Sequence, residues 1–154
     1  MIGGHMLVKD IMTKKIISVT PRTSVRELAK LFVKKGISGA PVVEKGKFIA
    51  VVLEEGVIFQ DKKVRPPLFI SLSVGFLTLG VKRFEDEIKK IAASSVKDIM
   101  EKNPLTVNPD MSIEDAATLM LEKGVFYLPV LEGSQLVGVV TKKDIVRAIA
   151  RLKR

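Results

Sequence analysis

The sequence predicts an α/β fold built from two tandem β-α-β-β-α units with pseudo-two-fold symmetry, their sheets packed together and their helices outside. The main observation is an internal duplication. An offset of 88 residues aligns Val8 to Ile58 with Val96 to Val146 without a gap, and 18 of the 51 positions are identical. In both copies, short apolar runs bounded by turn residues alternate with helical spacing. The chain has 154 residues, of which 47% are hydrophobic and 28% charged, a composition typical of a folded protein.

Each copy should begin with a short apolar strand that runs into a proline. These strands are expected at Ile16 to Val19 and at Leu105 to Val107. Pro21 and Pro109 follow them, and the residues before a proline are held extended.

A helix should start just after each proline. Ser24 with Glu27, and Ser112 with Asp115, have the spacing of a capping box, in which the side chains bond to free backbone N–H groups. Aspartate is the weaker partner in such a box. Apolar residues at helical spacing follow in each copy. Each helix should then end at a glycine, Gly36 or Gly124, because glycine readily adopts the left-handed conformation found at helix ends.

A hairpin and a second helix should complete each copy. The hairpin strands are expected at Ala40 to Val43 with Phe48 to Leu53, and at Leu128 to Leu131 with Leu136 to Val140. The second helices are expected to begin near Glu54 and Lys142. Because one copy cannot cover its own sheet well, packing two sheets together should bury one continuous core.

The segment 59–95 between the copies contains a long apolar run, Leu68 to Val81. The run is too short for a membrane span and is interrupted by glycines. It could form an edge strand or contact a second subunit, but burial in the core of the same chain is the favoured interpretation. A helix is expected from Arg83 to Ala93, with one buried face: Phe84, Ile88 and Ile91.

Composition excludes several kinds of site. The chain has no cysteine, which rules out disulfides, thiolate metal sites and a cysteine nucleophile, and is compatible with a reducing compartment. We therefore expect a cytoplasmic protein without a metal site. Residues 1–5 resemble a cloning remnant ahead of a start at Met6, so we assign no function to His5, the one histidine. The formal net charge of +9 favours anionic partners.

Two motifs resemble those of the cystathionine β-synthase (CBS) domain. Gly36 to Pro41 is similar to the Gly-hydrophobic-Ser-x-x-Pro signature of that family, and Gly138 to Ile145 is similar to its Thr-x-x-Asp ending. Within an ungapped duplication, the two motifs identify the chain as resembling a stand-alone CBS pair, or Bateman module. The repeats would be 8–58 and 96–150, joined by the inter-repeat segment 59–95.

The resemblance implies a regulatory module that binds AMP, ADP, ATP or S-adenosylmethionine between the two copies and requires no cofactor. It implies that Asp144 and Thr141 serve ribose and phosphate, and that residues of the other copy frame the adenine. It also implies a homodimer that signals to a protein partner. The residues carried over as ligand contacts are Asp144, Thr141, Lys143, Val139, Ser38, Ile37, Pro41, Lys14, Ile16 and Met12.

The chemistry of these residues agrees with that assignment. An ionised carboxylate such as that of Asp144 can accept hydrogen bonds from two neighbouring hydroxyls. Thr141 would open a helix, whose free N–H groups favour phosphate. The matching positive charge could come from both copies: Lys142, Lys143, Arg147, Lys14, Lys15 and Arg22.

A purely structural interpretation competes with ligand binding, because Thr141 and Asp144 also have the spacing of a capping box. The equivalent site of the other copy lacks the polar residues: Leu53 stands at the place of Thr141, Gly56 at that of Asp144, and Phe126 at that of Ser38. Glu54 and Glu55 replace two lysines and would repel phosphate. We therefore predict one competent site per chain.

Two other functions are less favoured. Nucleic-acid binding is suggested by the net charge and by the tail 142–154, which has six basic residues against one acid. However, aromatic residues are not interleaved with these charges, and no known nucleic-acid motif is present. Catalysis is disfavoured because no paired acid and base motif and no phosphate-binding glycine loop stand out.

Overall fold

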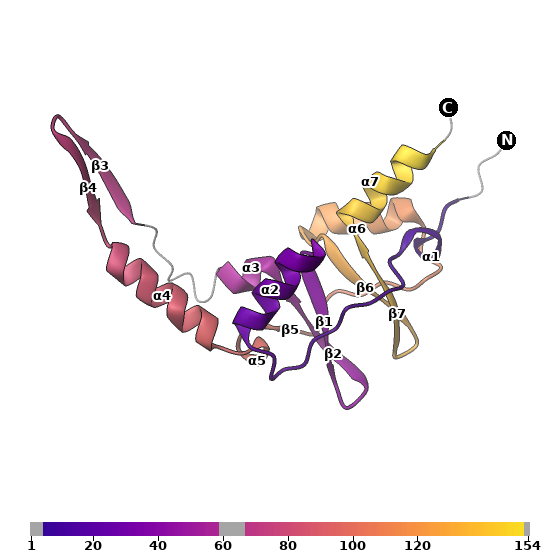
Figure 1. The fold of residues 1–154 in the computed structure, drawn as a ribbon. Coiled ribbons are helices and arrows are strands. Elements are labelled where there is room, and N and C mark those ends of the chain that lie inside the picture. Colours follow the sequence, from indigo (N-terminus) through magenta and orange to yellow (C-terminus); the bar gives the residue numbers. More distant parts are fainter. Residues whose placement is uncertain (1–4, 59–66, 153–154) are drawn as a thin grey trace.

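Each copy of the duplication folds into short helices and a β-hairpin, as the computed structural model shows for residues 5–58 and 67–152 (Figure 1). The first copy comprises α1 (Val8–Ile11), α2 (Val25–Lys35), β1 (Gly39–Glu44), β2 (Lys47–Leu53) and α3 (Glu54–Ile58). The second comprises α5 (Val96–Ile99), β5 (Glu101–Lys102), α6 (Ile113–Lys123), β6 (Tyr127–Glu132), β7 (Gln135–Thr141) and α7 (Lys142–Arg151). Between the copies lie β3 (Leu68–Leu72), β4 (Gly75–Leu79) and α4 (Val81–Ala93).

The capping residues act as the sequence predicted. The Glu27 N–H donates to Ser24 Oγ at 3.1 Å, and the Ser24 N–H donates back to Glu27 Oε2 at 3.2 Å. At the start of α6, the Asp115 N–H donates to Ser112 Oγ at 3.0 Å. Gly36 and Gly124 end α2 and α6 with φ values of 61° and 64°, the left-handed conformation that glycine adopts without strain.

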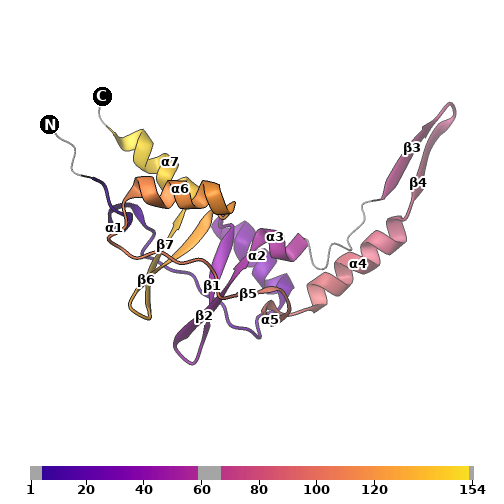
Figure 2. The ribbon, with the colours of Figure 1, turned by 180° about the vertical axis from the view of Figure 1, so that it is seen from behind.

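The two hairpins form separate small sheets that face each other. β1 pairs with β2, and the short β5 adds to the free edge of β2, while β6 pairs with β7. In both views the helices α2, α3, α6 and α7 lie along one side of the sheets, and the hairpin turns point to the other (Figures 1 and 2).

The first strand predicted in each copy is reduced to a single parallel bridge. Val19 pairs with Val42 and Val107 with Val130, and the residues around them form extended chain without a ladder. In the first copy the reason is visible, because Thr13 pairs with Val139 of the other sheet. The segment 13–19 therefore crosses from one sheet to the other and cannot follow either one as a full strand.

The copies exchange their first helical turns. α1 belongs to the first copy, yet Val8 is fully buried in the core of the second, where its N–H donates to Met111 O at 2.8 Å. Symmetrically, Val96 of α5 is fully buried in the first core, and its N–H donates to Thr23 O at 2.8 Å.

The expected continuous core is replaced by two cores and a small cluster between them. One core lies in each copy, and the cluster between the sheets is built on Val51, Tyr127 and Val139. The two hairpin turns diverge from each other (Figure 1), while Phe48 and Leu53 of β2 pack against this cluster.

The inter-repeat segment is not buried in the core, contrary to the favoured prediction. β3 and β4 form a hairpin that projects from the body at the end of α4 (Figure 2), and Phe69 and Phe76 are 67% and 81% exposed. α4 packs against α2, but along the predicted apolar face only Phe84 and Ile91 are half-buried and Ile88 is exposed. Within the described ranges, no helix has both the length and the hydropathy needed to cross a bilayer.

Candidate functional site

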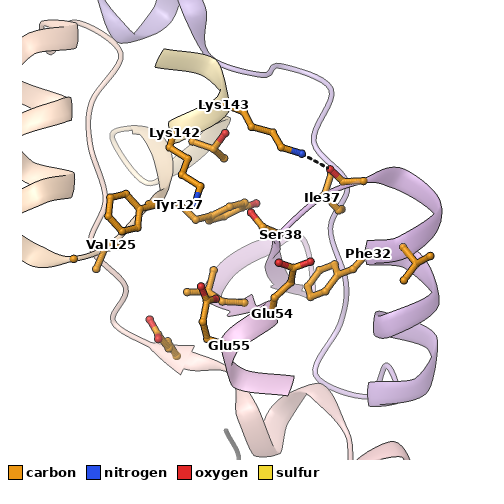
Figure 3. A pocket seen from close by; sticks show the side chains of 16 residues that line it. Phe32, Ile37, Ser38, Glu54, Glu55, Val125, Tyr127, Lys142 and Lys143 are labelled. Atoms are coloured by element: carbon orange, nitrogen blue, oxygen red, sulfur yellow. Dashed lines mark hydrogen bonds between the residues drawn. The ribbon is translucent and has the colours of Figure 1, made fainter. Parts of the chain in front are cut away.

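A cleft opens between the two copies where β2 leads into α3 and β7 leads into α7. It consists of two adjoining cavities of about 650 Å³ and 240 Å³, and the larger one has a volume typical of small-molecule sites. Both cavities are lined by residues from both copies: Gly36, Ile37, Ser38, Tyr127, Thr141 and Lys143. Figure 3 shows the larger cavity, with Lys142 and Lys143 on one wall, Glu54 and Glu55 on the opposite wall, and Tyr127 between them.

Asp144 forms the inner wall of the smaller cavity and is only 2% exposed. Its Oδ2 accepts from the Thr141 N–H at 2.8 Å and from Thr141 Oγ1 at 3.0 Å. Its Oδ1 accepts from Thr13 Oγ1 at 3.1 Å and from the Arg147 guanidinium at 3.0 Å. A buried carboxylate needs such partners. The Thr141 contacts also cap α7, so this pair does form the helix cap that the structural interpretation predicts.

Four cationic side chains line the cavity that contains this carboxylate. Lys15, Lys35, Lys143 and Arg147 line the smaller cavity, where Asp144 is the one acidic lining residue. Lys143 reaches across the cleft, and its Nζ donates to Gly36 O of the other copy at 3.1 Å. The cavity therefore combines an acceptor-rich inner wall with a cationic rim, which suits a ligand with hydroxyl groups at one end and an anion at the other.

Tyr127 lines both cavities. Its ring is buried, and burial raises the pKa of its hydroxyl, with a smaller contribution from the charge of Asp144. The equivalent position in the first copy is Gly39, and a Cβ there would lie 2.8 Å from the Tyr127 ring. The ring thus occupies space that only a glycine leaves free.

The structure brings six of the ten predicted contact residues together around the smaller cavity: Asp144, Thr141, Lys143, Val139, Ser38 and Ile37. Their role as ligand contacts remains a prediction, because no ligand is present.

The other four predicted residues lie elsewhere. Pro41 is fully buried in β1, and Met12 lies against the second core, where its sulfur would be 2.6 Å from a Cβ at Gly138. Lys14 is exposed outside both cavities, and Ile16 lines a different cavity near the hairpin turns. Side chains of extended chain alternate in direction, so Thr13, Lys15 and Ile17 line the cleft instead.

Sequence reasoning missed Thr13, Ile17, Lys35 and Tyr127 as lining residues. The alternation of extended chain could have indicated the first two, once one residue of the segment had been placed. The contrast of Gly39 with Tyr127 between the copies was a detectable signal for the tyrosine. Of the predicted cations, Arg22 lies apart and lines a cavity with Glu44 and Lys45.

The half of the cleft that belongs to the equivalent second site is apolar and acidic. Leu53, Glu54, Glu55, Glu101 and Phe126 line the larger cavity. Lys142 lies over the Phe126 ring, with 5.5 Å between Nζ and the ring centroid. A Cβ at Gly56 would be 3.2 Å from the Ile99 carbonyl oxygen, so the counterpart of Asp144 has little room there. Among the described residues, no cluster of three or more His, Cys, Asp or Glu could hold a metal ion.

Comparison with known proteins gives consistent matches over both copies. A model of the CBS domain family matches residues 8–60 and 96–151. The uncharacterised protein MJ1426 of Methanocaldococcus jannaschii is 32% identical over 157 residues, which span 96% of this chain and 93% of that protein.

Solved structures match equally well. The structure of CBSX2 in complex with AMP has a TM-score of 0.70 at 29% identity, covering 96% of this chain and 99% of the other. CBSX2 is a CBS-pair protein from Arabidopsis thaliana. The CBS domain pair of protein MJ0100, solved with 5′-methylthioadenosine and S-adenosyl-L-methionine, has a TM-score of 0.70 at 23% identity, covers 96% of this chain and 98% of that one, and shows the same fold.

Proposed function

Because the chain belongs to the CBS domain family and carries two such domains in tandem, we propose that it is a regulatory module that binds an adenine nucleotide in the smaller cavity. The observation that carries the proposal is the nearly buried Asp144 carboxylate, in a cavity that four cationic side chains from both copies line. The AMP complex of CBSX2, whose chain matches this one along nearly its whole length, supports the choice of ligand class.

In the proposed complex the ribose hydroxyls donate to Oδ1 of Asp144. That oxygen already accepts from Thr13 and Arg147, so the ligand must replace or share one of them. Arg147 is the partner that leaves more easily, because its side chain is 53% exposed and can be solvated when released. Once released, its guanidinium is free to bind phosphate, with the lysines of the rim beside it.

The charge of the rim favours AMP, ADP and ATP over S-adenosylmethionine. Phosphates are anionic and match Lys15, Lys35 and Lys143, whereas a sulfonium is cationic and would be repelled by them. The acidic wall formed by Glu54 and Glu55 restricts phosphate to the other side of the cleft. We therefore propose one nucleotide per chain.

A module of this kind acts by binding rather than by catalysis. The two walls of the cleft come from different copies. The contacts of a bound nucleotide would therefore change if the copies moved relative to each other. A ligand that binds two arrangements with different affinity shifts the equilibrium between them. The signal would pass to a protein partner or through a homodimer.

Titration calorimetry with AMP, ADP, ATP and S-adenosylmethionine tests the proposal, after removal of any carried-over ligand. We expect saturable binding of one phosphate-containing ligand per chain, lost in Asp144→Ala and retained in Asp98→Ala. Asp98 caps α5 with the same pair of contacts but lies outside both cavities. No binding to the wild type, or equal binding to both variants, would mean that Asp144 is a helix cap only. Nucleic acid would then be the favoured anionic partner.

A further inference from the structure

The projecting hairpin has one face made entirely of aliphatic side chains. Residues directly opposite each other in an antiparallel pair share a face, and successive residues alternate between faces. The register pairs Leu68 with Leu79 and Ile70 with Leu77, and Leu72 lies on the same side. We call this set, Leu68, Ile70, Leu72, Leu77 and Leu79, the aliphatic face. The opposite face alternates Phe69 and Phe76 with Ser71 and Thr78.

Most of the aliphatic face is exposed in the described chain, and only Ile70 is half-buried. Leu68, Leu72 and Leu79 remain 57%, 51% and 48% exposed, and the hairpin packs extensively only against itself. An isolated two-stranded hairpin is marginally stable at best in water. A contiguous apolar surface of this kind marks an interaction site.

The rest of the same chain is a poor candidate for the missing cover. The residues outside the described ranges are the two short termini and the segment 59–66, whose sequence Phe-Gln-Asp-Lys-Lys-Val-Arg-Pro is half charged. Burying those charges against leucines would cost more than the contact gains. The complement of the aliphatic face must therefore come from another molecule.

The charge distribution favours a second copy of this chain. Residues 68–81 contain no charged residue, and the arm as a whole, 67–93, has four basic and three acidic residues, in a chain of net charge +9. Two copies can thus approach through their arms with little of the repulsion that the rest of the surface would impose. An uncharged aliphatic face is also self-complementary, as a two-fold interface requires. An anionic bilayer fits less well, because the acids of α4, Glu85, Asp86 and Glu87, nearly balance its basic residues.

We propose that the hairpin is a dimerisation arm, in which the aliphatic faces of two copies pack against each other across a two-fold axis. The middle pair of the register, Ile70 with Leu77, would lie nearest the axis. Four strands would then form a small two-layer sandwich, which gives each hairpin the second layer that it lacks. This inference does not depend on which ligand the cleft binds.

Site-specific cross-linking tests the geometry, because the natural chain has no cysteine. We expect Ile70→Cys to form an intermolecular disulfide in dilute, mildly oxidising solution. Ser71→Cys, the next residue on the opposite face and nearly isosteric with the original, should not. Equal cross-linking of the two variants, or none in Ile70→Cys, would overturn the proposal.

Sedimentation of uncross-linked protein provides a second readout. The wild type should sediment as a dimer, Leu77→Asp as a folded monomer that still binds nucleotide, and Thr78→Asp as a dimer. A dimer that persists in Leu77→Asp would place the interface elsewhere. A monomeric wild type that instead co-sediments with phosphatidylcholine and phosphatidylglycerol vesicles would show that the hairpin binds lipid, and would equally refute the dimer.

Discussion

Replacing Asp144 by alanine should destabilise the fold even without ligand, because the carboxylate joins the start of α7 to Thr13 of the first copy. It accepts four hydrogen bonds, from Thr141 twice, from Thr13 and from Arg147. Losing the cap costs about 1 kcal/mol, and leaving the half-buried Thr141 hydroxyl without its acceptor costs up to about 1–3 kcal/mol, whereas the exposed donors of Thr13 and Arg147 can bond to water instead. Part of this loss is offset because the charged group no longer has to be desolvated.

The net expectation for Asp144→Ala is a loss of about 2–4 kcal/mol, which lowers the melting temperature of a chain of this size by roughly 5–15 °C. Urea unfolding followed by circular dichroism measures the free-energy change. Asp98→Ala is the matched control, because Asp98 accepts from the Ser95 N–H at 2.9 Å and from Ser95 Oγ at 3.0 Å but is exposed. Its loss should be clearly smaller. Equal losses in the two variants would refute the argument that Asp144 joins the copies beyond capping α7.

Three further predictions concern the cleft. Tyr127 is the one tyrosine; because burial raises its pKa, no phenolate absorbance should appear near pH 10–11, where free tyrosine ionises, until the protein unfolds. Because the folded state favours the neutral Tyr127 hydroxyl, the contribution of this group to the free energy of unfolding is complete below pH ~10 and declines at higher pH. Gly39→Ala should cost about 1–3 kcal/mol in urea unfolding, because its Cβ would clash with the Tyr127 ring, and unchanged stability would contradict that packing. Lys143→Ala should weaken AMP binding about tenfold, corresponding to ~1.4 kcal/mol, and leave adenosine binding unchanged in calorimetry; equal loss for both ligands would mean that Lys143 does not bind the phosphate.

Much of the fold could be predicted because the duplication repeats every signal. A capping serine, a terminating glycine or an apolar run is weak evidence alone, but each occurs twice at the same offset. The second helices begin at Glu54 and Lys142, where the sequence placed them. Local rules of this kind depend on neighbouring residues, which the sequence contains directly.

The contents of the cleft were harder to predict, because they depend on direction and on distant contacts. Lys15 and Ile17 line the cleft, one residue along from the predicted contacts Lys14 and Ile16, and in extended chain one residue reverses the side. No pattern in the sequence indicates the hydrogen bond between Thr13 and Asp144, which are 131 positions apart.

The inter-repeat segment shows a different limit of prediction from sequence. The apolar run from Leu68 to Val81 indicates side chains whose burial would be favourable, but hydropathy does not say which molecule would cover them. The prediction of burial within the same chain was wrong for that reason.

The exchange of α1 and α5 between the copies affects how such chains can recombine. The sequence Val-Lys-Asp-Ile-Met opens each repeat, yet each of these turns contributes its valine to the core of the opposite repeat. The inherited unit and the packing unit are therefore not the same stretch of chain. A hybrid of two homologous genes joined within 59–95 would place a foreign turn in both cores at once. A hybrid that transfers α1 together with the second repeat would keep that core intact, so crossovers that follow packing units should yield folded progeny more often than those that follow the repeat boundary.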